Sequence, residues 1–257
     1  MQKKIIFQVS PTKVSYAVCQ LFSGEVLHFK SVEIDPLKPV ESELDLLFDK
    51  DELLNASFDE VEVLHNNHLQ TIVPNEFFSE DRLGDFLQYT IKVYPTDYFS
   101  SDELSNIQAH NVYVPFVVFN NYLLEKFGAF TYQHIYTPLI EYTQKESLTD
   151  DLKFWVYKSE NQSAIIVFKE GKLLFFNAYE ILSKEDLLYY ILFVAEQLYI
   201  SFEEQTLILL GDFENENDYI LLLKKYINQI QIIETQLLAK KIQLSAEQLH
   251  QHFMLAL

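Results

Sequence analysis

The chain opens with a pattern typical of three consecutive β-strands. Residues 4–9, 14–21 and 26–34 are rich in β-branched and aromatic side chains, and apolar and polar positions often alternate within them. The turn-forming pairs Ser10-Pro11 and Ser23-Gly24 separate the three segments. We therefore predict an antiparallel meander at the start of the chain.

A helix and a fourth strand are predicted after the meander. Residues 42–45 read Ser-Glu-Leu-Asp, which resembles a capping box, the arrangement in which Ser42 accepts the first free N–H groups of a helix. A short apolar strand over 61–64 follows, so the predicted order is β-β-β-α-β. The apolar positions assigned to this helix are Leu44, Leu47, Leu53 and Leu54.

The same order returns in the second half of the chain. Glu170-Gly171 forms the second hairpin turn there, and Ser183 begins a capping motif before an amphipathic helix. A continuous apolar run at 206–210 is typical of a strand buried on both faces. The predicted strands are 153–158, 163–169, 172–179, 206–210 and 231–234, with a further helix over 218–228.

Two copies of the order β-β-β-α-β-α-β predict an α/β protein with mixed sheets and two lobes. This arrangement resembles the duplicated, RNase H-like architecture of the actin, sugar-kinase and Hsp70 superfamily. We predict a first lobe over 1–148 with an insertion around 74–142, and a second lobe over 149–257. The polar stretch 143–151 marks the predicted boundary. The alternative is an unrelated two-domain α+β chain in which the strand order coincides by chance.

Several short motifs spread over most of the chain point to one family. They are Asn111-Val112-Tyr113-Val114-Pro115-Phe116, a helix over 119–127 ending at Gly128, and the segments 130–134, 176–179, 185–190 and 209–211. Together they resemble a bacterial family of uncharacterised proteins known as domain of unknown function 3822. The resemblance implies an actin-like fold and no established activity.

The actin-like resemblance implies a nucleotide site at the turn after the first strand of each lobe. In active members these turns are rich in glycine and carry an acid, because backbone N–H groups must reach phosphate oxygens. In the turn 10–13 of this chain, Pro11 has no N–H, and only Ser10, Thr12 and Lys13 could contact a phosphate. The turn 159–162 has no glycine, and its acid would repel phosphate. We therefore predict a degenerate site and no cofactor.

Gly211 is a further candidate position, because ligands often bind where a buried strand ends. A lone glycine there is also an ordinary strand-to-loop turn, and the residues from Asp212 onward make the loop strongly negative. The alternative hypothesis is an atypical ATP-binding protein of the actin-like superfamily that uses Ser10, Thr12, Lys13 and Gly211.

No set of residues predicts a catalytic or a metal site. The first strand of each lobe lacks the acids of a two-metal nuclease, and no nucleophile elbow or phosphate-binding loop motif is present. His65 and His68 lack a third and fourth ligand, and we predict that they lie in a solvated or hydrogen-bonded polar loop. His250 and His252 would point to different helix faces. Cys19, the single cysteine, is predicted to pack inside a strand.

Net charge indicates which partners to exclude, and cysteine content indicates the compartment. The formal net charge of -19 would repel nucleic acid and anionic membrane surfaces. Arg82 is the only arginine, so a large anionic ligand would lack its usual planar anchor. A single cysteine fits a reducing compartment, and no apolar run approaches the ~20 residues that cross a bilayer. We expect a cytoplasmic protein.

We therefore predict a non-catalytic actin-like scaffold that binds an unidentified partner protein, and not an enzyme. The chain has 21 Phe and 16 Tyr, and runs such as 127–130 and 175–176 can line an interface or fill a core. An amphipathic segment through Leu244, Leu249, Phe253 and Leu257 can dock on a partner or on its own domain. An enzyme with a site between the lobes is a third hypothesis, which rests only on where ligands tend to bind.

Overall fold

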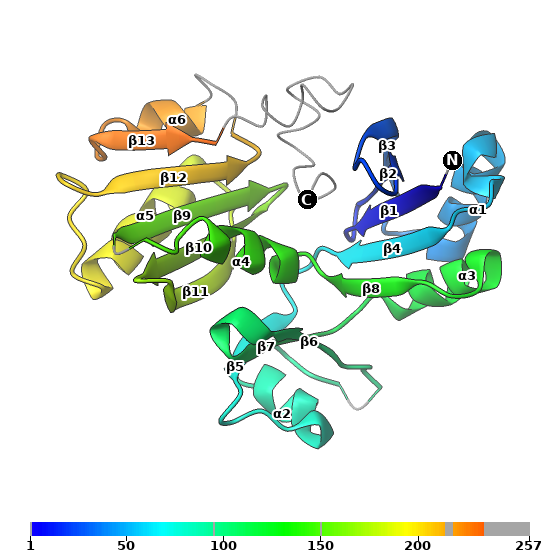
Figure 1. The fold of residues 1–257 in the computed structure, drawn as a ribbon, viewed down its shortest axis with the longest axis horizontal. Helices are drawn as coiled ribbons and strands as arrows, with labels where there is room; N and C mark the ends of the chain where they lie inside the picture. Colours follow the sequence, from blue (N-terminus) through cyan, green and yellow to red (C-terminus); the bar gives the residue numbers. More distant parts are fainter. Residues whose placement is uncertain (1, 95, 150, 214–217, 234–257) are drawn as a thin grey trace. The chain divides into compact units, whose positions relative to one another are not determined.

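The structure, a computed structural model, describes residues 2–94, 96–149, 151–213 and 218–233. The chain divides into two compact units, and the division falls after Pro138, inside helix α4 (Tyr136–Lys145). Each unit contains a five-stranded sheet with helices packed on it (Figure 1). The boundary after residue 148 stays a prediction about the limits of the lobes.

The first unit is built on a mixed sheet of order β3-β2-β1-β4-β8. The first three strands form the predicted antiparallel meander, and β4 and β8 run parallel to β1. Together with the helices α1 and α3, this sheet has the predicted order β-β-β-α-β-α-β. Its elements are β1 (Lys3–Val9), β2 (Lys13–Gln20), β3 (Val26–Glu33), α1 (Val40–Lys50), β4 (Glu60–His65), α3 (Val117–Phe127) and β8 (Thr131–His134).

The core of the first unit lies between one face of this sheet and the helices α1 and α3 (Figure 1). Side chains alternate along a strand, so Ile5, Phe7 and Val9 of β1 all face the helices. Phe7 packs against the rings of Tyr16 and Phe119 at 5.8 and 6.0 Å between centroids. The alternation of apolar and polar residues by which the strands were predicted therefore also places the apolar side chains in the core.

Helix α1 begins and ends earlier than predicted. Its N-cap is Pro39, whose carbonyl accepts the N–H groups of Ser42 and Glu43, so Ser42 lies inside the helix and does not cap it. The helix ends at Lys50 because Asp51 is extended. The predicted helix residues Leu53 and Leu54 instead belong to a separate turn, η1 (Glu52–Asn55), which the Asp51 side chain caps through the N–H of Leu53.

A separate antiparallel sheet, of order β5-β7-β6, lies between β4 and α3 in the sequence. Helix α2 covers one face of it, and Val73, Leu87 and Val112 form its small core (Figure 1). After β7 the chain returns to the first sheet through α3 and β8. The elements of this part are β5 (Gln70–Pro74), η2 (Glu80–Arg82), α2 (Leu83–Leu87), β6 (Ser100–Leu104), η3 (Ser105–Ile107) and β7 (Ala109–Tyr113).

The second unit repeats the order β-β-β-α-β-α-β in a mixed sheet of order β11-β10-β9-β12-β13. The predicted turn Glu170-Gly171 is confirmed, and both residues have positive φ, at 53° and 72°. The elements are β9 (Leu152–Ser159), β10 (Gln162–Lys169), β11 (Lys172–Glu180), α5 (Lys184–Gln197), β12 (Thr206–Gly211), α6 (Asp218–Leu223) and β13 (Gln229–Ile232).

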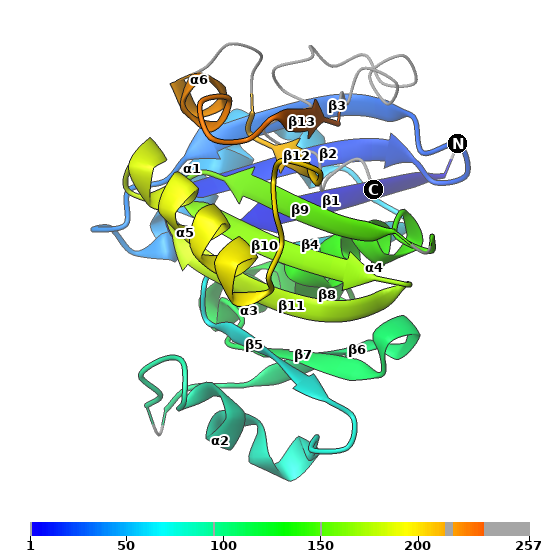
Figure 2. The same ribbon diagram turned by 90° about the vertical axis from the view of Figure 1, so that its left-hand side faces the viewer.

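Helix α5 lies across one face of the second sheet (Figure 2), and Leu187, Ile191 and Val194 pack into the core there. Its predicted cap is confirmed: Ser183 accepts the N–H of Asp186, and Asp186 accepts the N–H of Ser183. Such a reciprocal pair satisfies N–H groups that a helix start leaves without partners.

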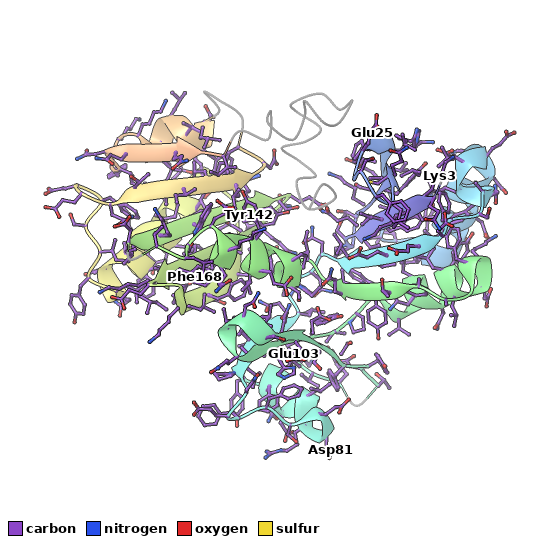
Figure 3. All side chains as sticks on the ribbon, viewed as in Figure 1. Lys3, Glu25, Asp81, Glu103, Tyr142 and Phe168 are labelled. Carbon is purple, nitrogen blue, oxygen red and sulfur yellow. The ribbon has the colours of Figure 1, made fainter. Side chains whose placement is uncertain are left out.

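Helix α4 covers the opposite face of the second sheet. Tyr142 of α4 is labelled in Figure 3. Its ring packs edge-on against that of Trp155 of β9, with 6.4 Å between the centroids. The indole N–H of Trp155 donates to Ser147 Oγ at 2.9 Å. Part of the stretch 143–151, which its composition marked as a polar boundary, is therefore helical or buried.

Two predictions concern the far end of the chain and membranes. The amphipathic segment through Leu244, Leu249, Phe253 and Leu257 lies outside the described residues. Within the part of the chain that the structure describes, no helix has the length and apolar character of a membrane span.

Candidate functional site

The turn between β1 and β2 holds the predicted phosphate-contacting residues of the first unit, Ser10, Thr12 and Lys13. The N–H of Ser10 donates to the carbonyl of Lys13 at 2.9 Å, and the carbonyl of Thr12 accepts the N–H of Ile34 at 2.9 Å. Ser10 is buried, Thr12 is exposed and Lys13 is half-buried. Much of the turn's backbone therefore closes its own hairpin, and Pro11 adds no donor.

The carboxyl ends of β1, β4 and β8 meet at the same edge of the first sheet. Val9 pairs with His65 in register, and His65 pairs with His134. The N–H of Asn66 donates to the carbonyl of Val9 at 2.8 Å, which extends the ladder one residue beyond the strands. This edge is where a parallel sheet usually presents its functional side chains.

The predicted solvated or hydrogen-bonded loop is found only in part: His65 is buried at the end of β4, whereas His68 is exposed in the loop that follows. His65, Asn66 and Asn67 are at most 2% exposed. The side chain of Asn67 donates to the carbonyl of Val114 at 2.9 Å and accepts the N–H of Leu69 at 2.8 Å. These bonds hold the point where the chain leaves the first sheet and later returns to it.

Both histidines at this edge are neutral. His134 Nδ1 accepts the N–H of Tyr136, so its Nε2 carries the proton and donates to the carbonyl of Asn67 at 3.0 Å. Burial lowers the pKa of His134 to about 3 and the pKa of His65 to about 4. Neither ring can serve as a general base with a pKa near 7, and both act as fixed hydrogen-bonding groups.

Asp102 of β6 is the centre of a network that the sequence did not indicate. Its carboxylate accepts the N–H of His134 at 2.8 Å, the hydroxyl of Thr137 at 2.6 Å and the hydroxyl of Tyr113 at 3.0 Å. Burial, and then the nearby carboxylate, raise the pKa of Tyr113. With three donors already bound, this carboxylate ties the three-stranded sheet to the end of β8.

In the second unit the corresponding turn joins β9 and β10. It contains only Glu160 and Asn161 between the paired residues Ser159 and Gln162, and Glu160 has a positive φ of 53°. The ammonium of Lys158 donates to the carbonyl of Glu160 at 3.0 Å. The Lys158 side chain thus already occupies one face of this short turn.

Gly211 ends β12 beside that turn. A Cβ atom at this position would lie 2.2 Å from the carbonyl oxygen of Lys158, and φ is +84°. The N–H of Asp212 donates to the same oxygen at 2.8 Å. The glycine is therefore required by a close approach between β12 and β9, and the protein's own atoms fill the space that a missing side chain would leave for a ligand.

Lys158 and Asp212 form an ion pair of 3.1 Å in which the lysine side chain is only 8% exposed. The ring of Tyr219 lies 5.1 Å from the ammonium. Reading the sequence did not single out Lys158, because a lysine at a strand end gives no signal of its own. Asp212 and Tyr219, which contact Lys158, are far from it in the sequence and reach it only when the unit is folded.

Among the described residues no group of three or more His, Cys, Asp or Glu is placed to hold a metal ion. Cys19 packs inside β2 as predicted, and burial raises the pKa of its thiol. Ser10, Thr12 and Lys13 belong to the first unit and Gly211 to the second, and their roles in binding a phosphate stay predictions.

Two solved structures are similar to this chain. The first, from Bacteroides thetaiotaomicron VPI-5482, is described as a protein with an actin-like ATPase fold and unknown function. It is 22% identical, with 90% of this chain and 91% of that chain covered and a TM-score of 0.81. The second is a PilM-PilN type IV pilus biogenesis complex, 11% identical, with 98% and 96% covered and a TM-score of 0.59.

At these identities the likeness shows the fold, and it confirms the predicted actin-like α/β architecture. No curated protein matches the sequence. The model of the family described as "Protein of unknown function (DUF3822)" matches residues 1–230. This match covers most of the chain and confirms the resemblance seen in the short motifs, so the protein belongs to the DUF3822 family.

Proposed function

We propose that the protein is a non-catalytic, actin-like scaffold that binds another protein and whose nucleotide site is degenerate. The observation that carries the proposal is the arrangement at the end of β12. There the backbone at Gly211 lies against that of Lys158, and the Lys158 ammonium is held by Asp212 and the carbonyl of Glu160. A nucleotide phosphate would have to displace these contacts, and the carboxylate would repel it.

The first unit supports the same conclusion. A phosphate cradle needs several backbone N–H groups directed at one point. In the turn 10–13, the N–H of Ser10 is bonded to Lys13 and Pro11 has none. Thr12 and Lys13 remain as the residues best able to meet a phosphate.

The exposure of Thr12, together with the half-buried Lys13, favours the alternative of an atypical ATP-binding protein. Under this hypothesis Ser10, Thr12, Lys13 and Gly211 contact the nucleotide. A lysine ammonium and a hydroxyl can hold a phosphate without a glycine-rich loop, although with fewer donors.

The similarity to the PilM-PilN complex supports a protein partner for this chain. The name of that structure describes a protein assembly, and its fold is shared over nearly the whole chain. A scaffold needs no bound nucleotide if its lobes serve to present a binding surface.

Titration of the purified protein with Mg-ATP and Mg-ADP separates the two hypotheses. Binding to the native state at 100 times Kd would add about 2.7 kcal/mol of stability, which thermal unfolding and calorimetry both detect. We expect no shift in Tm and no heat of binding. A saturable shift that Lys13→Ala abolishes would establish the ATP-binding alternative and overturn the degenerate site.

A further inference from the structure

The first unit has a groove of about 330 Å³ beside helix α3. None of its lining residues carries a formal charge at neutral pH. Its lining comes from Tyr98 in the segment before β6, from helix α3, and from the segment that leads into β8. The lining includes Tyr98, Val117, Asn121, Leu124, Phe130 and Tyr132. A neutral, partly aromatic groove of this kind suits apolar groups with a few polar contacts.

Aromatic contacts hold Tyr132, one of the lining residues, in place. The ring of Tyr132 meets that of His65 edge-on at 5.6 Å and that of Phe130 at 6.1 Å. Tyr98 is hydrogen-bonded to Tyr132, and this bond raises the pKa of Tyr98. A groove whose walls are already ordered loses little conformational entropy when it is filled.

The face of α3 beside the groove has the apolar residues Val117 and Leu124 at its ends and two asparagines between them. Val117, Val118 and Leu124 are 36%, 45% and 55% exposed, while Phe119 and Leu123 supply the buried face of the same helix. Exposed apolar residues are ordinary when they are scattered, but here they border a groove. This helix therefore buries one apolar face in the core and leaves apolar side chains exposed at the groove.

A larger, charged groove adjoins this one. A neighbouring groove of about 740 Å³ shares Ala129 and Phe130 with it and is lined by Asp59, Glu60 and Lys126 among others. The Lys126 ammonium lies over the rings of Phe48 and Tyr122, at 5.5 and 5.2 Å from their centroids. The first 138 residues carry 20 acidic and 9 basic side chains, so the first unit as a whole attracts cations.

We propose that these two grooves together bind a segment of a partner protein that has two apolar side chains, aromatic or leucine-like, next to lysine or arginine residues. The apolar side chains enter the neutral groove beside Leu124, and the basic residues lie along Asp59 and Glu60. The proposal rests on the scaffold function and names its binding surface and the chemistry of its partner. The charges of the surface set the sign of the partner's charges.

The test uses the full chain and a random peptide library. Peptides selected on the protein are labelled, and their Kd values are measured by fluorescence anisotropy. We expect selected sequences with paired apolar residues beside Lys or Arg, and an increase in Kd of about tenfold or more in the variant Leu124→Glu. Leu221→Glu is the matched control, because Leu221 is 50% exposed on α6 of the second unit and should leave Kd unchanged.

A second variant, Asn121→Lys, adds a positive charge in the groove at an exposed position. It should also weaken the selected peptides, and replacing their basic residues by Glu should do the same. Selected peptides that bind Leu124→Glu as tightly as the wild type, or that share no such pattern, would overturn the proposal.

Sedimentation distinguishes a second copy of this chain from a separate partner. A wild-type dimer that Leu124→Glu converts to a monomer would make the second copy the occupant and overturn the proposal. The titration with Mg-ATP is independent of these results. If the nucleotide binds and the peptides still require Leu124, the degenerate site is wrong and the groove proposal stands.

Discussion

At Gly211 the backbone of the second unit leaves no room for a side chain. Gly171 has the same left-handed conformation, with φ at +72°, but the nearest atom to a Cβ there is 3.5 Å away, an ordinary contact. Substituting Gly171 therefore introduces backbone strain alone, whereas substituting Gly211 introduces the same strain and a steric clash.

We expect Gly211→Ala to lower the free energy of unfolding by about 3 kcal/mol, since left-handed strain costs roughly 1–2 kcal/mol and overpacking a similar amount. Gly171→Ala should lower the free energy of unfolding only by the roughly 1–2 kcal/mol of left-handed strain. Urea unfolding followed by the fluorescence of Trp155, the single tryptophan and a buried residue of the second unit, measures both. Equal losses would mean that the contact with Lys158 does not matter.

The buried histidines make the first unit sensitive to acid. The pKa values of His65 and His134 lie near 4 and 3 in the folded protein and near 6.5 when unfolded. Between these values only the unfolded chain takes up protons, so the stabilisation is complete above pH 6.5 and falls as the pH decreases.

We expect the free energy of unfolding to fall by roughly 4 kcal/mol between pH 7 and pH 5. Urea unfolding followed by circular dichroism at each pH measures this change. His134→Gln should remove about half of this pH dependence, because glutamine can still donate to Asn67 but does not titrate. A variant with the full wild-type dependence would show that His134 is not one of the groups responsible.

At the scale of single elements, the two predicted helix caps give a direct comparison. Ser183 and Asp186 make reciprocal bonds at the start of α5, whereas Ser42 is exposed and lies inside α1 with Pro39 as the N-cap. Both serines precede an acid by three residues, so the sequence motif is the same. Only one of them makes the bonds.

We expect Ser183→Ala to lower the free energy of unfolding by about 1 kcal/mol and Ser42→Ala to change it by less than about 0.5 kcal/mol. Thermal unfolding measured by circular dichroism is sufficient. A loss at Ser42 as large as that at Ser183 would mean that Ser42 acts as a cap in solution.

Elements with strong local signals could be predicted from the sequence, and those without them could not. The hairpin turn at Glu170-Gly171 and the apolar run of β12 each depend on adjacent residues. Strand β6 reads Ser-Ser-Asp-Glu-Leu and buries only Leu104, so it has no alternation to detect. The segment 74–142 therefore gave no clear layout, although the structure divides it between a separate sheet and the return through α3 and β8.

At the scale of the whole molecule, the repeated order of elements was sufficient to predict an actin-like fold. The site was not predictable to the same degree, because its contacts join residues far apart in the sequence. Lys158 and Asp212 are 54 positions apart, and Asp102 and His134 are 32 apart. The turn 10–13 could be identified because its residues are adjacent in the sequence. The residues of these pairs come together only when the sheets have formed.

The chain leaves the five-stranded sheet of the first unit for the three-stranded sheet and returns from it at nearly one point. Asn67 donates to the carbonyl of Val114, and the N–H of Val114 donates to the carbonyl of Leu69 at 3.0 Å. A subdomain attached through such adjacent ends can be exchanged or enlarged without moving the strands on either side. Changes within the three-stranded sheet can therefore leave the five-stranded sheet intact as long as Asp102 keeps its bond to the N–H of His134.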